Sequence, residues 1–421
     1  MSDLSMKVTW EREHYVPRHL HFRAELCHSF NLLSLCSRRR RSSMSANFPQ
    51  WLLSCLTKSH INHARLTLSN REFARERARS SFQHDDDSPA SHIEHYSTEI
   101  GDLPMNRSYN RYQDVQPYNR TRVIVGDSTD DPEGRYFSAN WVRELYGGKW
   151  WIATQAPLPH SAHVFLSVIL QTITRPPACL CHSSPSDMAK PSRIRTVVQL
   201  TRNAEGGRRK ADPYFPSTVG QSCIVQSIDA HPLKLTLLEK RTIADAQCVQ
   251  STVSILPMTS SSEPPDSNEE QPEPVIFQHM FYTAWPDHGV PDETTSLINF
   301  IRLVDRTNKD LSPAGEDLDP DPPIMVSCSA GIGRTGAFIA LSSLLRAHQL
   351  LSQPPSNDPA SNVIALPGLP PPPLGPLPPA FDDDLVAQEI DSLREQRPRM
   401  VERDEQIVLI YEGLAAALMS G

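Results

Sequence analysis

The segment IMVSCSAGIGRTGAF, Ile324 to Phe338, constrains the fold of this chain more than any other feature. Its apolar start, within PIMVSCS, predicts a short buried strand. From Gly333 the run GRTGAFIALSSLLRAHQLL places its large apolar residues on one face, which predicts a helix. The glycines between these two runs predict a tight loop. We therefore expect a strand, a glycine loop and a helix as the architectural centre of the chain.

The loop carries a cysteine and an arginine, Cys328 and Arg334. A thiol is a good nucleophile only as a thiolate, which requires positive potential nearby. Inward-turned N–H groups of a small-residue loop, and the start of the following helix, supply that potential, while an arginine fork can hold two phosphate oxygens. We predict an anion cup with the Thr335 hydroxyl beside the sulfur; the cup is formed by Cys328, Ser329, Ala330, Gly331, Ile332, Gly333 and Arg334. An inert buried cysteine is the alternative, and a Walker-type loop is excluded because G-K-[ST] is missing.

The motif CSAGIGRTG resembles the signature loop of the classical protein tyrosine phosphatases, of the non-receptor type and similar to fungal members. Further motifs extend the resemblance from about Tyr109 to the C-terminus, roughly three quarters of the chain. The resemblance implies an α/β (α+β) fold, with a central, highly twisted mixed β-sheet flanked by helices. It also implies that Cys328 is the nucleophile and that no metal or organic cofactor is needed.

Three other motifs imply the rest of the site. The acid loop WPDHGVP, Trp285 to Pro291, resembles the closing loop of the family, with Asp287 as general acid. The recognition loop NRYQDVQPYNRTRV, Asn110 to Val123, resembles the phosphotyrosine-binding segment, in which Tyr112 stacks on the substrate ring and Asp114 binds substrate amides. In LTRNAEGGRRKADPYFP the resemblance assigns Glu205 to orient Arg334 and Lys210 to reach the acid loop.

The sequence departs from the family pattern at several positions. Ser327 precedes the cysteine where histidine is common, so we expect the thiol to ionise less readily than in relatives with that histidine. Glu402 stands where many members have a water-positioning glutamine, whereas the second glutamine is present as Gln406. Arg399 replaces glycine and is expected to narrow the rim or attract an acidic substrate. Arg135 and Ser138 replace an Asp and an Asn, which predicts a lost hydrogen bond beneath the recognition loop.

The 38 prolines of this 421-residue chain cluster between hydrophobic segments, which predicts one domain with insertions. We expect a disordered N-terminal extension at 1–46 and a phosphatase domain at 47–421, beginning with two short helices in FPQWLLSCL and REFARERARSSF. Disordered insertions are predicted near 177–193, 259–274, 306–323 and 353–385. The proline-rich segment 369–379 favours polyproline II and is either a ligand for an SH3-type groove or a passive spacer.

Charge and composition narrow the class of protein. A net charge of -8 argues against nucleic-acid binding, and the eight cysteines lack C-x-x-C spacing, which disfavours a metal or disulfide scaffold and fits a reducing compartment. No apolar run approaches the roughly 20 residues that span a bilayer. We expect a cytoplasmic protein without membrane contact, with the nucleus as a second location.

The motifs together favour hydrolysis of phosphotyrosine in proteins through a cysteinyl-phosphate, with MAP kinases as substrates by analogy to fungal enzymes. Two alternatives stay open. The departures at Ser327, Glu402, Arg135 and Ser138 motivate a phosphotyrosine-binding pseudophosphatase. A dual-specificity or lipid phosphatase shares the cysteine loop but has no use for the stacking Tyr112.

Overall fold

The computed structural model describes seven stretches of the chain: residues 48–80, 89–126, 134–171, 193–258, 273–310, 319–351 and 371–420. Ser45–Gly421 forms one compact unit. The extension predicted at 1–46, most of the insertions predicted at 177–193, 259–274 and 353–385, and residues 311–318 of the insertion predicted at 306–323 lie outside the described residues. Among the described helices, none combines the length and apolar character that crossing a membrane requires.

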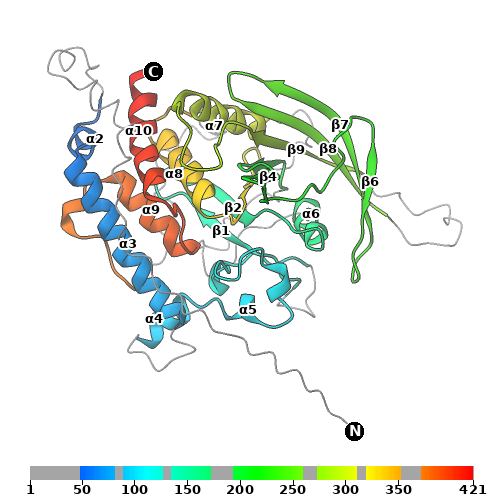
Figure 1. Ribbon diagram of the computed structural model, residues 1–421, viewed down its shortest axis with the longest axis horizontal. Helices are drawn as coiled ribbons and strands as arrows, with labels where there is room; N and C mark the ends of the chain where they lie inside the picture. Colours follow the sequence, from blue (N-terminus) through cyan, green and yellow to red (C-terminus); the bar gives the residue numbers. More distant parts are fainter. Residues whose placement is uncertain are drawn as a thin grey trace, which may run out of the picture. The chain divides into compact units, whose positions relative to one another are not determined.

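An eight-stranded mixed sheet forms the centre of the unit (Figure 1). β10 (Ile324–Cys328) lies between β2 (Trp150–Gln155) and β3 (Thr196–Gln199) and is parallel to both. β3 is also parallel to β9 (Val275–Tyr282). The remaining neighbours are antiparallel: β1 (Ala139–Arg143) on one edge, and β8 (Cys248–Pro257), β7 (Leu233–Ile243) and β6 (Ser222–Val225) on the other. This arrangement confirms the predicted fold class.

Helices or loops cover both faces of the central strands. Successive side chains of a strand point to opposite faces, so neighbouring residues pack against different layers. Trp151 packs on Phe338 of α8 (Gly333–Ala347), and Tyr282 packs on Phe300 of α7 (Thr294–Lys309). The neighbouring Ile152 faces the other way, in a core cluster with α6 (Ala162–Leu170). β10 is buried along its whole length, as its uninterrupted apolar run predicted.

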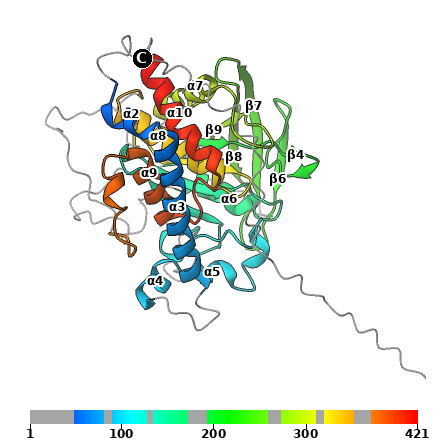
Figure 2. The ribbon, with the colours of Figure 1, turned by 60° about the vertical axis from the view of Figure 1, so that its left-hand side comes forward.

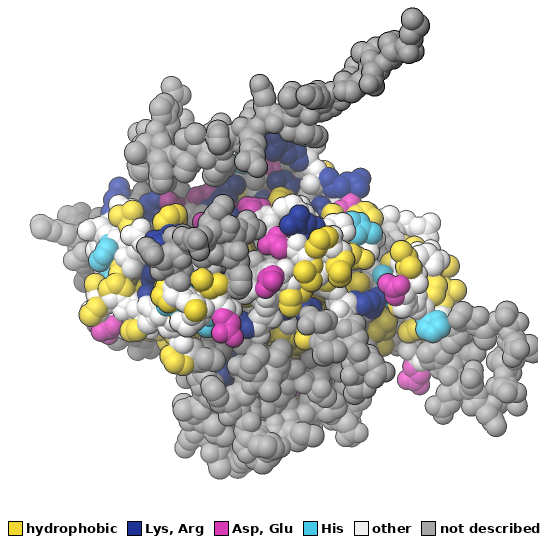
Figure 3. Space-filling view, turned by 90° about the horizontal axis from the view of Figure 1, so that it is seen from below, with side chains coloured by type: hydrophobic (Ala, Val, Ile, Leu, Met, Phe, Trp, Pro, Cys, Tyr) yellow, Lys and Arg dark blue, Asp and Glu magenta, His cyan; other side chains and the backbone are white. Residues whose placement is uncertain are grey.

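The helices α9 (Leu385–Gln396) and α10 (Asp404–Ser420) complete the layer that contains α8. The long α3 (Lys58–Ser80) lies along α9 and α10 (Figure 2). On the face in Figure 3, hydrophobic, acidic and basic side chains are interspersed. The short elements are α2 (Gln50–Cys55), α4 (Ala90–His95), α5 (Glu99–Asp102), η2 (Arg107–Tyr109), η3 (Asn119–Thr121), η5 (Pro379–Phe381), β4 (Ala204–Glu205) and β5 (Arg208–Arg209).

Two predictions about the borders of elements were wrong. The second N-terminal helix is not short, since α3 has 23 residues and begins at Lys58. The insertions predicted at 306–323 and 353–385 were drawn too wide. Residues 306–309 end α7, and residues 371–385 pack on the domain because Arg71 donates to the carbonyl oxygens of Leu374, Gly375 and Pro376 and because Phe381 is buried.

Candidate active site

The anion cup lies between the end of β10 and the start of α8. The Cys328 sulfur is 3.2 Å from the Gly331 nitrogen, whose N–H points at it. Gly331 has a φ of +73°, and a Cβ there would come within 2.2 Å of the Thr154 carbonyl oxygen. Only glycine fits this position, because the left-handed backbone and the close approach to β2 both exclude a side chain.

Arg397 holds the cup from behind, and the sequence analysis missed it. Its Nε donates to the Gly331 carbonyl at 2.8 Å and its Nη2 to the Ala330 carbonyl at 3.0 Å, while its Nη1 donates to Asn140 at 2.7 Å. Because these carbonyls face Arg397, the N–H groups of the cup can face the sulfur. Burial lowers the pKa of Arg397 to about 10, and the neighbouring Cys328 opposes that shift. Its place in LREQRPRM, five residues before Glu402, was the available signal.

Arg334 is fixed in orientation by a bidentate ion pair. Its Nη1 is 2.6 Å from Glu205 Oε1 and its Nη2 is 2.8 Å from Glu205 Oε2. Nη2 also donates to the Pro286 carbonyl of the acid loop at 3.0 Å. Burial alone would raise the pKa of Glu205, but hydrogen bonds from Arg334 and Thr201 lower it below its ordinary value. Glu205 therefore stays ionised and keeps the guanidinium fork aligned.

The acid loop lies over the cup. Trp285 is buried, and the Arg334 guanidinium lies 5.9 Å from its ring. Asp287 lines the same pocket as Cys328, and its Oδ2 accepts a hydrogen bond from the Gly206 N–H. Lys210 also lines this pocket, yet no hydrogen bond or ion pair joins its ammonium to Asp287 in the described part of the chain. The contact expected of Lys210 is thus made by the Gly206 backbone.

Tyr112 stands at the pocket wall. Its hydroxyl lies 2.8 Å from the Ser329 hydroxyl, which itself donates to the Lys210 carbonyl at 2.7 Å, so Tyr112 is the donor. The recognition loop is held by two residues that the sequence analysis did not assign. Gln155 accepts from the Arg111 N–H at 2.8 Å, and the Tyr136 hydroxyl donates to Asn110 at 2.7 Å.

The side chains of Arg135 and Ser138, which differ from the family pattern, lie in different surroundings. Arg135 turns to His163 and Ser167 of α6, away from the recognition loop. The Ser138 hydroxyl is buried and has no hydrogen-bond partner within the described stretches. The loop nevertheless keeps its support, because Tyr136 and Gln155 supply it.

Arg399 crosses the pocket rim. Its Nη1 is 2.8 Å from Asp114 Oδ2, and its Nη2 is 3.7 Å from Glu402 Oε1. Asp114, which the resemblance assigns to substrate amides, is therefore engaged by Arg399. Arg399 thus joins two residues of the pocket lining, Asp114 and Glu402, and its effect on the rim stays a prediction.

The remaining predicted residues are Glu402, Gln406, Thr335 and Ser327. The pocket has a volume of about 250 Å³, and both Glu402 and Gln406 line it. Gln406 is buried and accepts from the Arg403 N–H at 3.1 Å. Thr335 is fully buried, and its hydroxyl has no hydrogen-bond partner in the part of the chain described. Ser327 is buried and its hydroxyl donates to the Val198 carbonyl at 3.3 Å.

One group of side chains elsewhere has potential metal ligands. Cys55, His60 and Asp384 offer ligand atoms within 4.8 Å of one another. Asp384 is already used, because it caps α9 through the N–H groups of Val386 and Ala387 and accepts from the Tyr411 hydroxyl. These residues do not line the catalytic pocket, so they add nothing to its chemistry.

Comparison with known proteins agrees with this geometry. The sequence profile described as "Protein-tyrosine phosphatase" matches residues 106–192 and 187–357. The chain therefore belongs to the protein-tyrosine phosphatase family.

Relatives and a solved structure extend the comparison. Receptor-type tyrosine-protein phosphatase eta of Mus musculus is 31% identical over 253 residues, covering 59% of this chain and 16% of that protein. The Lar-like tyrosine-protein phosphatase of Caenorhabditis elegans is 28% identical over 332 residues, which is 78% of this chain and 11% of that protein. Phosphatidylinositol phosphatase PTPRQ of Rattus norvegicus is 29% identical over 252 residues, which is 60% of this chain and 9% of that protein. The chain thus spans only a small part of these relatives.

A solved structure described as "Structural basis of PTPN18 fingerprint on distinct HER2 tyrosine phosphorylation sites" has a TM-score of 0.53 and 21% identity. The superposition covers 76% of this chain and 87% of the chain in the solved structure. At this identity the likeness supports the fold alone.

Proposed function

We propose that this chain hydrolyses phosphotyrosine in proteins through a cysteinyl-phosphate intermediate. The observation that carries the proposal is the convergence on one pocket of Cys328, the aligned Arg334 and Asp287. This constellation provides a nucleophile, an anion clamp and a proton donor, which are the three requirements for transferring a phosphoryl group from an aryl ester.

In the first step the Cys328 thiolate attacks phosphorus in line with the leaving oxygen. The S–P bond forms, the P–O bond to the tyrosine breaks, and protonated Asp287 gives its proton to the departing phenolate oxygen. Arg334 and the N–H groups of the cup hold the three remaining phosphoryl oxygens. The Glu205 pair keeps the fork of Arg334 in the plane that two of those oxygens require.

In the second step water attacks the cysteinyl-phosphate. Asp287, now a carboxylate, takes a proton from the water, and the S–P bond breaks to give inorganic phosphate and the thiolate. Gln406 lines the pocket and is the residue we assign to position the water, with Glu402 beside it. The Thr335 hydroxyl, which lacks a partner among the described residues, stabilises the leaving sulfur.

Variants of the nucleophile and the acid test this proposal. Cys328→Ser should abolish hydrolysis of p-nitrophenyl phosphate, because an alcohol at this position is not ionised, and should retain binding of a phosphotyrosine peptide. Asp287→Ala should lower kcat by about 10²-fold or more for leaving groups of high pKa and much less for p-nitrophenol. Cys223→Ser, at a free cysteine on the edge strand β6, is the matched control and should keep wild-type rates. Turnover by Cys328→Ser would remove the assignment.

A second candidate function is a phosphotyrosine-binding module that turns over slowly. The observation that favours it is Glu402, which lies 3.7 Å from Arg399 where the family commonly has a glutamine. A carboxylate there would repel the phosphoryl intermediate and slow its hydrolysis. Rapid mixing separates the two: a burst of phenolate followed by a slow steady state indicates impaired hydrolysis, whereas tight peptide binding with no burst indicates a binding module.

Two further parts of the proposal concern the substrate of the enzyme and its location in the cell. We propose a non-receptor enzyme, similar to fungal members, that acts on MAP kinases in the cytoplasm or nucleus. Rates on phosphotyrosine, phosphothreonine and phosphoinositide substrates separate this from a dual-specificity or lipid phosphatase, a comparison prompted also by the relative named as a phosphatidylinositol phosphatase. Preference for phosphoinositide would overturn the assignment of Tyr112 as a selector of phosphotyrosine.

The proline-rich segment 369–379 is proposed as a ligand for an SH3-type groove. Arg71 donates to the carbonyl oxygens of Leu374, Gly375 and Pro376, so such a partner must open this contact. An Arg71→Ala chain should therefore bind an SH3 domain more tightly than the wild type does.

A further inference from the structure

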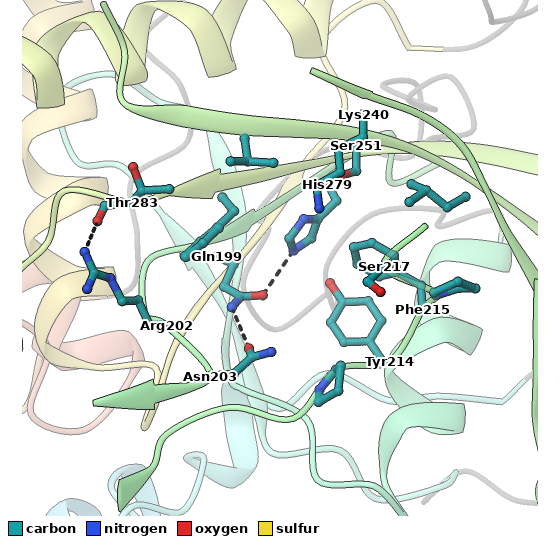
Figure 4. Close-up of a pocket in the computed structure, with 15 residues that line it drawn as sticks. Gln199, Arg202, Asn203, Tyr214, Phe215, Ser217, Lys240, Ser251, His279 and Thr283 are labelled. Atoms are coloured by element: carbon teal, nitrogen blue, oxygen red, sulfur yellow. Dashed lines mark hydrogen bonds between the residues drawn. The ribbon is translucent and has the colours of Figure 1, made fainter. Parts of the chain in front are cut away.

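A second cavity lies on the side of the sheet that holds β7, β8 and β9. Its volume is about 510 Å³, and its lining residues come from β3, β7, β8, β9 and the segments around 202 and 215 (Figure 4). None of its lining residues lines the catalytic pocket. A cavity of this size accepts a small organic molecule.

Aromatic rings form one wall of this second cavity. The Phe215 and His279 rings lie 4.9 Å apart at their centres, and the Tyr214 and Phe215 rings lie 5.2 Å apart. Phe281, Leu237 and Val249 add apolar surface to the lining. Such walls favour a flat aromatic ligand, because ring edges and faces then pack against one another.

Two polar atoms in the lining are without partners. Tyr214 is 7% exposed, and its hydroxyl makes no hydrogen bond to any described residue. Burial lowers the pKa of His279 to about 3, so its ring is neutral. Gln199 donates its amide to Thr201 and Asn203 and accepts through its oxygen from His279 Nε2, which therefore carries the proton. His279 Nδ1 remains as an acceptor with no partner in the described ranges.

The charge at the mouth of the second cavity has one sign. Arg202 and Lys240 both line it and are exposed, and neither lies within an ion-pair distance of a carboxylate in the described part of the chain. The lining contains no aspartate or glutamate. The Arg202 guanidinium turns to Thr283 and donates to its carbonyl oxygen at 3.1 Å (Figure 4), whereas the Lys240 ammonium has no bonded partner among the described residues. Two cations without a matching carboxylate favour a ligand that carries a negative group.

We propose that this second cavity is a binding site for a small planar aromatic carboxylate. The rings of the ligand lie against Phe215 and His279, the Tyr214 hydroxyl meets a polar atom of the ligand, and the carboxylate faces Lys240.

Occupation of the second cavity is coupled to the catalytic arginine through a short chain of contacts. Gln199 and Arg202 line the cavity, and the Arg202 N–H donates to Glu205 Oε1 at 3.0 Å. Thr201, which accepts from Gln199 through its carbonyl, donates its hydroxyl to the same Glu205 oxygen at 2.7 Å. Since Glu205 orients Arg334, a ligand that shifts residues 199–203 changes kcat without occupying the catalytic pocket.

The binding test uses 2-naphthoate and, as an uncharged match, 2-naphthamide, titrated into the full chain by calorimetry with orthovanadate present to fill the catalytic pocket. We expect one saturable site for 2-naphthoate and binding of 2-naphthamide weaker by about fivefold, since one charge contact in a partly exposed site contributes roughly 1 kcal/mol. Absence of saturable binding, or equal binding of the two probes, would overturn the proposal.

Variants at exposed positions locate the site. Ser217→Trp fills the mouth of the second cavity and should abolish 2-naphthoate binding, and Lys240→Glu should weaken it by about fivefold or more. Lys234→Glu, exposed on the same strand β7 but not part of the lining, is the matched control. Binding unchanged in Ser217→Trp would place the probe elsewhere.

Steady-state kinetics test the coupling separately. With p-nitrophenyl phosphate as substrate, 2-naphthoate should change kcat in the wild type and not in Ser217→Trp. Purely competitive inhibition that persists in Ser217→Trp would show that the probe binds the catalytic pocket, and would overturn the coupling. Because binding is measured without turnover, a chain that lacks phosphatase activity would still give a clear answer about the second cavity.

Discussion

Arg399 adopts a backbone conformation that glycine tolerates better. Its φ is +59°, in the left-handed region where a side chain costs about 1 kcal/mol. Its side chain is partly exposed and pairs with Asp114, which is 71% exposed. An exposed pair contributes little stability, so the strain is not offset by the ion pair. We infer that the residue is tolerated for its effect on the rim, since it restrains Asp114 and the neighbouring Glu402.

Replacing Arg399 with glycine tests this view. Arg399→Gly should raise the free energy of unfolding by about 0.5 to 1 kcal/mol, because the strain is relieved. It should also lower KM for a phosphotyrosine peptide several-fold, because Asp114 becomes free to bind backbone amides, and should change KM for p-nitrophenyl phosphate less. Urea unfolding and steady-state kinetics measure the two effects. Lys234→Ala, at an exposed position of β7 that lines neither pocket, should change neither. A peptide KM that rises in Arg399→Gly would contradict the restraint of Asp114.

At the scale of elements, α3 is joined to α9 by buried ion pairs. Arg75 is fully buried, and its Nη2 lies 2.6 Å from both Asp391 Oδ1 and Glu395 Oε1. The Tyr96 hydroxyl also donates to Glu395 at 3.0 Å. Burial would raise the pKa of Glu395, but hydrogen bonds from His95 and the charge of Arg75 lower it to about 2. The packing of α3 on α9 thus depends on buried ion pairs, in which the cation and the carboxylates stabilise each other.

Removing the cation should therefore be costly. Arg75→Met removes the cation that Asp391 and Glu395 share, although Asp391 keeps its ion pair with Arg71 and Glu395 keeps its hydrogen bond from Tyr96. We expect a loss of about 3 kcal/mol in the free energy of unfolding at neutral pH, because one buried cation then no longer balances two buried carboxylates. Chemical denaturation measures this loss. Glu76→Gln, an exposed change one residue further along α3, should alter stability by less than about 0.5 kcal/mol. Equal stability of Arg75→Met and wild type would show that the pairs do not hold α3.

At the scale of the whole molecule, one buried carboxyl group links three parts of the fold. Glu389 of α9 accepts from the N–H groups of Leu145 and Tyr146 after β1, both at 3.2 Å. It also lies 2.6 Å from the Ser343 hydroxyl of α8. Burial, and then the charge of Glu144, raises the pKa of Glu389 from an ordinary value of 4.5 to about 8.

This raised pKa predicts a pH dependence of stability. Below about pH 4.5 the carboxyl is protonated in the folded and the unfolded chain, so its contribution is fully present. Above about pH 4.5 the unfolded chain loses this proton while the folded protein retains it, so stability falls as the pH rises. The fall ends near pH 8, where the folded protein loses the proton as well. Glu389→Gln should therefore lose less stability than the wild type between pH 5 and 8, by on the order of 4 kcal/mol.

Denaturation at a series of pH values checks this expectation. Glu239→Gln, at an exposed position of β7, is the matched control and should follow the wild-type profile. Parallel profiles for wild type and Glu389→Gln would mean that Glu389 is ionised in the folded protein.

Local features of the chain were the ones that could be predicted. The strand, the anion cup and α8 are contiguous in sequence, so apolar periodicity and loop glycines determine them. The acid loop and the recognition loop were found as short motifs, and the structure brings Asp287 and Tyr112 to the same pocket as Cys328. The mixed sheet was expected from the resemblance, and the structure confirms it.

Supporting contacts could not be predicted, because they join residues far apart in the chain. Arg397 reaches Gly331 across 66 positions, and Arg399 reaches Asp114 across 285. Gly206 meets Asp287 through a backbone N–H, which every residue except proline has, so sequence offers no signal for it. The expectation for Lys210 was drawn from resemblance, and the local turn at Gly206 placed a different donor nearest to Asp287.

The sequence by itself therefore identified the three groups that carry the proposed chemistry: a cysteine in a glycine loop, an arginine at the end of that loop and an aspartate on a separate loop. Only the tertiary structure decided which groups support that chemistry, how Arg399 joins Asp114 and Glu402, and where the second cavity lies. The physical reason is that a catalytic loop is encoded by contiguous residues, whereas the second cavity exists only once β3, β7, β8 and β9 align beside Tyr214 and Phe215.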